Sequence, residues 1–139
     1  MTAFVVIDTN VVLDLFVYND PLSQPLREAL QGTNLKWIST QPMRDELERV
    51  LAYPQIVKRL GSSTELPVAA ADVLRAFDAQ AKLVPCAVKA PCTCKDPDDQ
   101  GFVDLAYAHK AVLISKDKAV LCMQKRLKKL DVKVLRNLV

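Results

Sequence analysis

Short apolar runs alternate along the chain with longer segments in which apolar residues recur at helical spacing. Continuous apolar runs of this length are typical of strands buried on both faces. We expect strands over residues 4–7, 36–38, 83–84, 112–114 and 132–135, with 87–88 as a further candidate. We expect helices over residues 11–18, 21–30, 42–53, 55–60, 65–81, 97–110 and 118–130. Strands separated by helices predict an α/β fold, a three-layer α/β/α domain around a parallel sheet of four to five strands.

Length and composition narrow the classes of protein. The 139 residues suit a single domain spanning 1–139, and a chain that is half hydrophobic and a quarter charged is too apolar to be disordered. Its three glycines, Gly32, Gly61 and Gly101, are isolated from one another, which excludes a P-loop or a dinucleotide-binding glycine motif. The single histidine, His109, lies in no catalytic motif, so hydrolysis based on histidine is not expected.

The N-terminal segment and the cysteines bear on the compartment. The first apolar run ends at Asp8 and follows no basic residue, so it resembles neither a signal peptide nor a membrane span. We therefore expect a cytoplasmic protein, without a membrane partner, whose cysteines are reduced thiols. Cys86, Cys92 and Cys94 lack the C-x₂-C spacing of a typical zinc site, and we interpret them as small apolar residues of a loop.

The net charge of +3 is modest, but the charges are unevenly distributed. Residues 116–136 contain eight Lys or Arg and two Asp, whereas residues 96–104 contain four Asp and no basic residue. This separation suits an anionic ligand held on a basic surface beside a carboxylate cluster. The alternative is a lysine-rich helix face that only contacts solvent.

Four acids are predicted to meet at one edge of the sheet. Asp8 directly follows the strand 4–7, and Asp117 lies three residues after the strand 112–114. Ligands of such sheets bind beyond the carboxyl ends of the strands, where the strand order reverses. On helical wheels, Asp99 shares the buried stripe of its helix and Glu46 borders that of helix 42–53.

A carboxylate directed into a core is unfavourable unless a cation neutralises it, and no basic residue shares these stripes. Mg²⁺ or Mn²⁺ would supply that cation, because both prefer several oxygen ligands. The alternative is that the aspartates only cap helices. Capping does not explain Glu46.

Four motifs resemble the PIN domain, and in particular toxin components of bacterial toxin–antitoxin pairs. The resemblance covers nearly the whole chain, in the order of the family. The motifs are Val-Ile-Asp8-Thr-Asn10-Val, Glu46-Leu with Val50-Leu51, Asp96-Pro-Asp-Asp99-Gln100-Gly-Phe102, and Leu-Ile-Ser115-Lys116-Asp117.

The resemblance implies a metal-dependent endoribonuclease that cleaves phosphodiester bonds by metal-activated water. Its metal ligands and catalytic residues match Asp8, Glu46, Asp99 and Asp117, with Mg²⁺ or Mn²⁺ as the cofactor. In this mechanism Glu46 helps to position or deprotonate the attacking water. Asn10 and Ser115 match residues that orient ligands or water. The basic side chains that would contact the RNA backbone are Lys116, Lys118, Lys125 and Arg126.

Two residues depart from the family pattern, and two further expectations concern partners. Lys116 stands where many members have Gly, so it either crowds the site or contacts a phosphate; Gln100 replaces a common Asn. A crowded site would favour an inactive PIN-like module that binds RNA or protein. Asp14 is a further acid that could lean toward the site.

The resemblance suggests a small antitoxin as partner, and the apolar segment 11–18 could form a homodimer.

Overall fold

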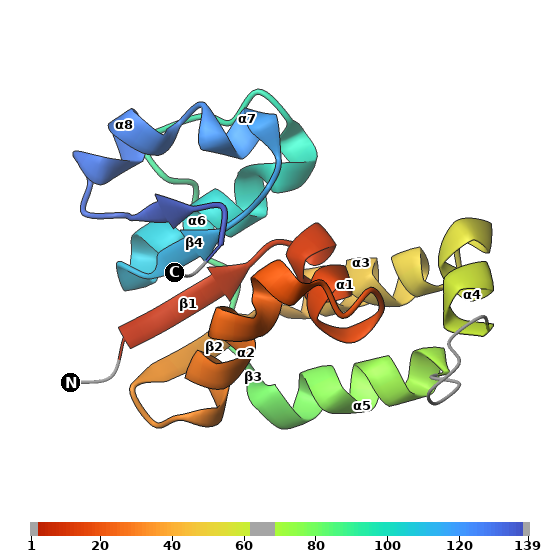
Figure 1. Ribbon diagram of the computed structural model, residues 1–139. Coiled ribbons are helices and arrows are strands. Elements are labelled where there is room, and N and C mark those ends of the chain that lie inside the picture. The colour runs from red at the N-terminus through yellow and green to blue at the C-terminus, as the bar shows by residue number, and fades with distance from the viewer. Residues whose placement is uncertain (1–2, 62–68, 138–139) are drawn as a thin grey trace.

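The computed structural model describes residues 3–61 and 69–137, which form one five-stranded sheet flanked by helices (Figure 1). All strand pairs are parallel, in the order β3-β2-β1-β4-β5. The strands are β1 (Ala3–Ile7), β2 (Leu35–Ser39), β3 (Ala81–Leu83), β4 (Val112–Ile114) and β5 (Val134–Leu135). The predicted α/β class and the parallel sheet are confirmed.

Helices connect consecutive strands. The first group is α1 (Thr9–Phe16), the 3₁₀ turn η1 (Pro21–Ser23), α2 (Gln24–Gln31), α3 (Gln41–Leu51), α4 (Pro54–Gly61) and α5 (Ala70–Gln80). The second is the 3₁₀ turn η2 (Pro97–Asp99), α6 (Gln100–His109), α7 (Lys118–Leu121) and α8 (Gln124–Lys128). Side chains at strand ends start several of these helices, since Asp8, Thr40 and Asp117 each accept a backbone N–H of the following turn.

The sheet separates two hydrophobic cores. Val5 and Ile7 of β1 belong to the core that includes α1, α2, α3, α4 and α5, whereas Val6 belongs to the core that includes α6, α7 and α8. This alternation follows from the two-residue period of a strand. Figure 1 shows α6, α7 and α8 on one side of the sheet and α1, α2 and α5 on the other.

The central pair of strands creates the edge where a ligand is expected. From β1 the chain continues to β2 on one side, and it later returns to β4 on the other. Ile7 is in register with Ile114, and the N–H of Asp8 donates to the carbonyl of Ile114 at 3.0 Å. Residues that follow β1 and β4 therefore meet where the strand order reverses.

Some predicted elements differ from the observed ones. The third strand lies at 81–83, not 83–84, and 87–88 belongs to a loop in which Val88 is 86% exposed. The helix expected over 118–130 is two short helices, because the chain turns at residues 122–123. Apolar spacing does not reveal this break, since positions 120, 123 and 127 would share one face of a continuous helix. The last strand is shortened to 134–135.

Two other predictions concern the segments around α1 and α5. The helix expected over 65–81 is observed from Ala70 to Gln80, and its predicted start lies outside the described residues. Most apolar residues of α1, including Val11 and Leu15, are buried in the core of this one chain, so they offer little surface to a second copy.

No helix in the described ranges has the length and apolar character that crossing a membrane requires.

Candidate active site

Three aspartates from separate parts of the chain form a carboxylate cluster. Asp8 follows β1, Asp99 ends η2, and Asp117 precedes α7. One carboxylate oxygen from each lies within 4.8 Å of the others. Asp8 is 3% exposed and Asp99 7% exposed, whereas Asp117 is half-buried. The strand-end rule and the helical wheel thus identified three residues that the fold brings together.

Ser115 links two members of the cluster. It is fully buried, and its Oγ donates to Oδ2 of Asp8 at 2.6 Å. The same Oγ accepts the backbone N–H of Asp117 at 3.1 Å. Asp117 in turn accepts the N–H of Ala119 through Oδ1 at 2.8 Å. These hydrogen bonds hold the two carboxylates in one orientation, as partners of metal ligands commonly do.

Asp99 carries the least compensated charge of the cluster. Its Oδ2 is buried and has no hydrogen-bond partner among the residues that the structure describes. Burial, together with the neighbouring Asp117 and Asp8, raises the pKa of Asp99 from 3.8 to about 8. Burial also raises the pKa of Asp8, and the hydrogen bond from Ser115 only partly opposes this. The described residues supply no ion pair to any of the three aspartates.

Gln100 holds the loop that leads to Asp99. Its Oε1 accepts the N–H of Cys94 at 2.6 Å, and its Nε2 donates to the carbonyl of Cys92 at 3.0 Å and to Asp104 at 2.7 Å. Asp104 also accepts the N–H of Ala90 at 2.8 Å. Gln100, which stands where the family commonly has Asn, therefore still supports this loop, because its longer side chain reaches across the loop to Cys92 and Cys94.

Glu46 lies beside the cluster and outside the group of three. It is half-buried on α3, and the hydroxyl of Thr9 donates to its Oε2 at 3.1 Å. Burial and the charges of Asp8 and Asp98 raise the pKa of Glu46. The sequence patterns do not predict this role of Thr9, which follows Asp8 directly and begins α1.

Lys116 does not pair with the cluster, despite preceding Asp117. Its Nζ forms an ion pair with Oδ2 of Asp14 on α1 at 2.5 Å. The side chain of Asp14 is only 10% exposed, so this pair neutralises a buried acid. The structure thus gives Lys116 a partner outside the carboxylate cluster.

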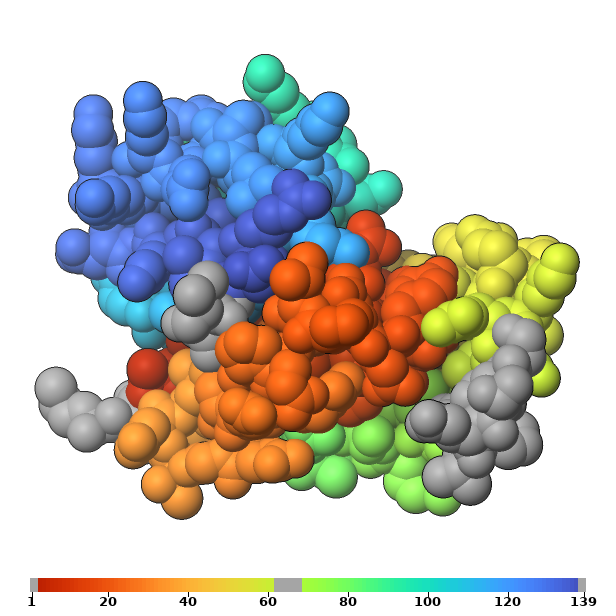
Figure 2. All heavy atoms as spheres, in the orientation of Figure 1, coloured from red at the N-terminus to blue at the C-terminus, as the bar shows by residue number. Residues whose placement is uncertain are grey.

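The other predicted contact residues lie nearer the surface. Asn10 is exposed; its backbone N–H donates to Asp8 at 3.3 Å. Lys118 is exposed at the start of α7, close in sequence to Asp117. Lys125 and Arg126 are exposed on α8, which lies farther from the carboxyl ends of the strands than α7 does (Figure 1). Figure 2 shows side chains of this C-terminal part projecting from the surface.

A comparison with protein families agrees with this geometry. A family model described as the PIN domain matches residues 4–119. The chain belongs to the PIN-domain family. PIN domains are in general metal-dependent nucleases that act on RNA, and the matched range includes all three clustered aspartates. A search of curated proteins found no match.

The residues of this PIN domain fit a divalent cation. Three carboxylates supply the hard oxygen atoms that Mg²⁺ and Mn²⁺ prefer. A cation between them would partner the buried Oδ2 of Asp99 and offset the burial and the neighbouring charges that raise its pKa. These three carboxylates are therefore better compensated with a bound divalent cation than without one.

Proposed function

We propose that the protein is a divalent-metal-dependent endoribonuclease, and that it is the cytoplasmic toxin of a toxin–antitoxin pair. The observation that carries the proposal is the cluster of Asp8, Asp99 and Asp117, in which a buried carboxylate oxygen of Asp99 has no partner among the described residues. Membership of the PIN-domain family supports a nuclease at the level of the family. The toxin role rests on the resemblance of the motifs.

In this proposal Asp8, Asp99 and Asp117 hold one or two ions of Mg²⁺ or Mn²⁺. A bound ion would stabilise the charge that develops on the phosphoryl oxygens and would ease the deprotonation of water. Ser115 keeps Asp8 and Asp117 oriented for this task, through the two hydrogen bonds of its Oγ. Asn10, at the exposed rim, orients the substrate or a water molecule.

Glu46 acts on the attacking water. Its Oε2 is held by the hydroxyl of Thr9, which leaves Oε1 to accept a proton. A raised pKa makes Glu46 a stronger base than an exposed glutamate and places it closer to neutral pH. Position and basicity therefore both support the role of a general base.

The proposed substrate is RNA, and the proposed protein partner is a small antitoxin. Lys118 directly follows Asp117 and is exposed, whereas Lys116 is paired with Asp14, so we place Lys118 on the RNA backbone. Lys125 and Arg126 would contact RNA farther from the scissile bond. The antitoxin would inhibit by covering the carboxylate cluster and so excluding RNA.

Cleavage of a labelled single-stranded RNA in Mn²⁺ tests the enzyme. The wild-type protein should cut internally, and EDTA or Asp8→Asn should abolish cutting. Glu46→Gln should lower kcat by about 10²-fold or more, as expected for loss of a general base. Asp45→Asn and Glu48→Gln are matched controls, because both residues are exposed on α3.

Two outcomes would contradict the proposal. Cutting that persists in EDTA or in Asp8→Asn would exclude the metal site. Binding of RNA without any cutting would identify the inactive binding module instead. The toxin role has its own test, since expression of the wild type in bacteria should arrest growth and expression of Asp8→Asn should not.

A further inference from the structure

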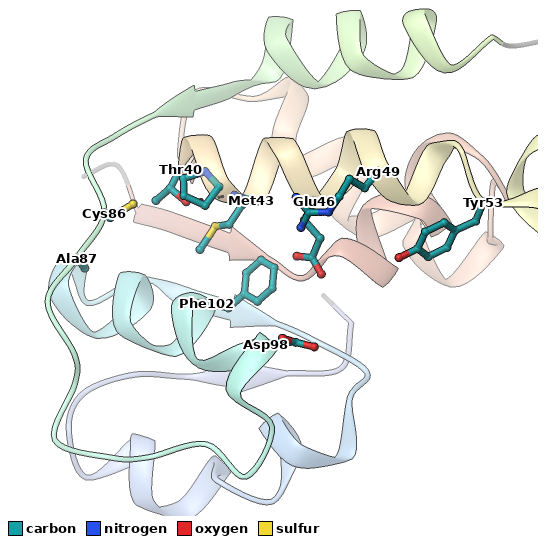
Figure 3. A pocket seen from close by; sticks show the side chains of 11 residues that line it. Thr40, Met43, Glu46, Arg49, Tyr53, Cys86, Ala87, Asp98 and Phe102 are labelled. Carbon is teal, nitrogen blue, oxygen red and sulfur yellow. Dashed lines mark hydrogen bonds between the residues drawn. The ribbon is translucent and has the colours of Figure 1, made fainter.

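A pocket extends from Glu46 along α3, and the nuclease mechanism does not use most of it. Its volume is about 370 Å³, within the usual range for small-molecule sites. Figure 3 shows Glu46 near its middle, with Thr40, Cys86 and Ala87 toward one end and Arg49 and Tyr53 toward the other. The pocket therefore has two arms that meet at the proposed general base.

The arm beyond Met43 is apolar with one buried polar group. Met43, Ala87 and Phe102 line it, and Phe102 is 3% exposed. Thr40, 3% exposed, accepts the N–H of Met43 at 3.5 Å and so keeps its own hydroxyl proton to donate. Apolar walls with one fixed hydrogen-bonding group suit a flat heterocycle.

The opposite arm carries a cation. Arg49 is exposed, and of the described residues that line the pocket it is the only basic one. It forms no ion pair or hydrogen bond through its side chain within the described part of the chain, although its charge lowers the pKa of Glu46. A guanidinium without an ion pair can bind a phosphate with two parallel hydrogen bonds.

The spacing of the lining residues along α3 agrees with a pocket of two arms. Thr40 caps α3 and Glu46 follows six residues later, which is roughly 9 Å along the helix at 1.5 Å per residue. Arg49 follows one helical turn later, on the same side of α3 as Glu46. A ligand with an apolar ring in one arm and an anion in the other would thus pass the Glu46 carboxylate.

We propose that this pocket binds one nucleotide of a single-stranded RNA, with its base between Met43, Ala87 and Phe102 and a phosphate on Arg49. The inference rests on the proposed nuclease and adds a base-recognition subsite to it. Single-stranded RNA is the fitting form, because its bases are unpaired and free to enter a pocket.

Two exposed cysteines allow a test that needs no turnover. All four cysteines are free thiols, and Cys86 lines the pocket whereas Cys122 lies outside it. We would measure the alkylation rate of each by N-ethylmaleimide, using peptide mass spectrometry on the full-length protein in Mg²⁺. The probes are the ribonucleoside 5′- and 3′-monophosphates, with ribose 5-phosphate as the control that lacks a base.

At least one nucleotide should slow the alkylation of Cys86, roughly tenfold at ten times its Kd, and leave Cys122 unchanged. Ala87→Leu, which fills the apolar arm, should abolish the protection, while Val88→Leu on the exposed neighbour should keep it. Melting curves of both variants verify folding. Arg49→Gln should weaken nucleotide binding.

Three results would overturn the proposal: no protection by any nucleotide at millimolar concentration, equal protection by ribose 5-phosphate, or equal protection of Cys122. Protection of Cys86 in a protein that cuts no RNA would leave the subsite standing and refute the nuclease. Cutting of RNA without protection of Cys86 would refute the subsite alone.

Discussion

Replacing Asp99 with asparagine should stabilise the metal-free protein, although it removes a residue of the candidate metal site. Asp99 is 7% exposed, and its Oδ2 has no partner among the described residues. Burial and the neighbouring Asp117 and Asp8 raise its pKa from 3.8 to about 8. Asparagine keeps the shape of the side chain but cannot ionise. The variant should therefore lack the electrostatic cost that the wild type carries.

The sign and size of this effect follow from the pKa. Because the raised pKa means that Asp99 holds its proton more tightly in the folded than in the unfolded state, its contribution to stability is fully present below about pH 4. It is lost as the pH rises to 8. At about 1.4 kcal/mol per pKa unit the full shift corresponds to roughly 6 kcal/mol. Screening at the open side of the cluster and burial of the amide reduce this, and we expect about 2 kcal/mol at pH 8.

Urea unfolding in EDTA at pH 4.5 and pH 8 measures the difference. Asp99→Asn should exceed the wild type in free energy of unfolding by about 2 kcal/mol at pH 8 and by much less at pH 4.5. Asp45→Asn, on an exposed position of α3, should match the wild type at both values. Saturating Mn²⁺ should reverse the order, since only the intact cluster gains binding free energy from the ion.

Equal stability of Asp99→Asn and the wild type in EDTA at pH 8 would refute this reasoning. Such a result would mean that burial and the neighbouring carboxylates do not disfavour the ionised form of Asp99 in the metal-free fold. An advantage of the variant that is the same at both pH values would refute it as well, because a packing effect does not titrate.

Three further predictions concern residues that support the site. Ser115→Ala should lower cleavage activity by about 10- to 100-fold, because it removes the hydrogen bond to Asp8. The matched control Ser39→Ala, at a buried serine that ends β2, should leave activity within about threefold of the wild type. Lys116→Met should lower the free energy of unfolding in urea by about 1 kcal/mol or more, because it leaves Asp14 unpaired. Adding Asp14→Leu should restore part of that loss, and purely additive effects of the two substitutions would contradict the ion pair. Gln100→Ala should lower the free energy of unfolding by about 2 kcal/mol and speed amide exchange over residues 92–96, because Gln100 holds this loop through its hydrogen bonds. Unchanged exchange there would contradict that role of Gln100.

The sheet and the three aspartates of the carboxylate cluster could be predicted because they depend on local patterns. A buried run followed within three residues by an acid marks the end of a parallel strand, and this identified Asp8 and Asp117. The helical wheel separated Asp99 from Asp104 and Glu46 from Asp45. These arguments need only the period of an element and the rule that ligands bind at one edge.

Contacts between distant elements could not be predicted in this way. Thr9 supports Glu46 from another helix, 37 residues away in sequence. The pairing of Lys116 with Asp14 joins the end of β4 to α1 and depends on which face of α1 the sheet buries. A pattern along one element carries no information about the side chain that faces it across a layer.

The same limit applies to the positive charge that RNA requires. The sequence concentrates basic residues between 116 and 136, which favours that segment as the RNA-binding surface. In the fold, Lys116 neutralises Asp14, and Lys125 lies on α8, farther from the carboxyl ends of the strands. Arg49, from outside that segment, lines the pocket that holds Glu46 and forms no ion pair in the described ranges. Because an already paired cation must give up its partner to bind a phosphate, Arg49 should contribute more to substrate binding near the scissile bond than Lys116 does.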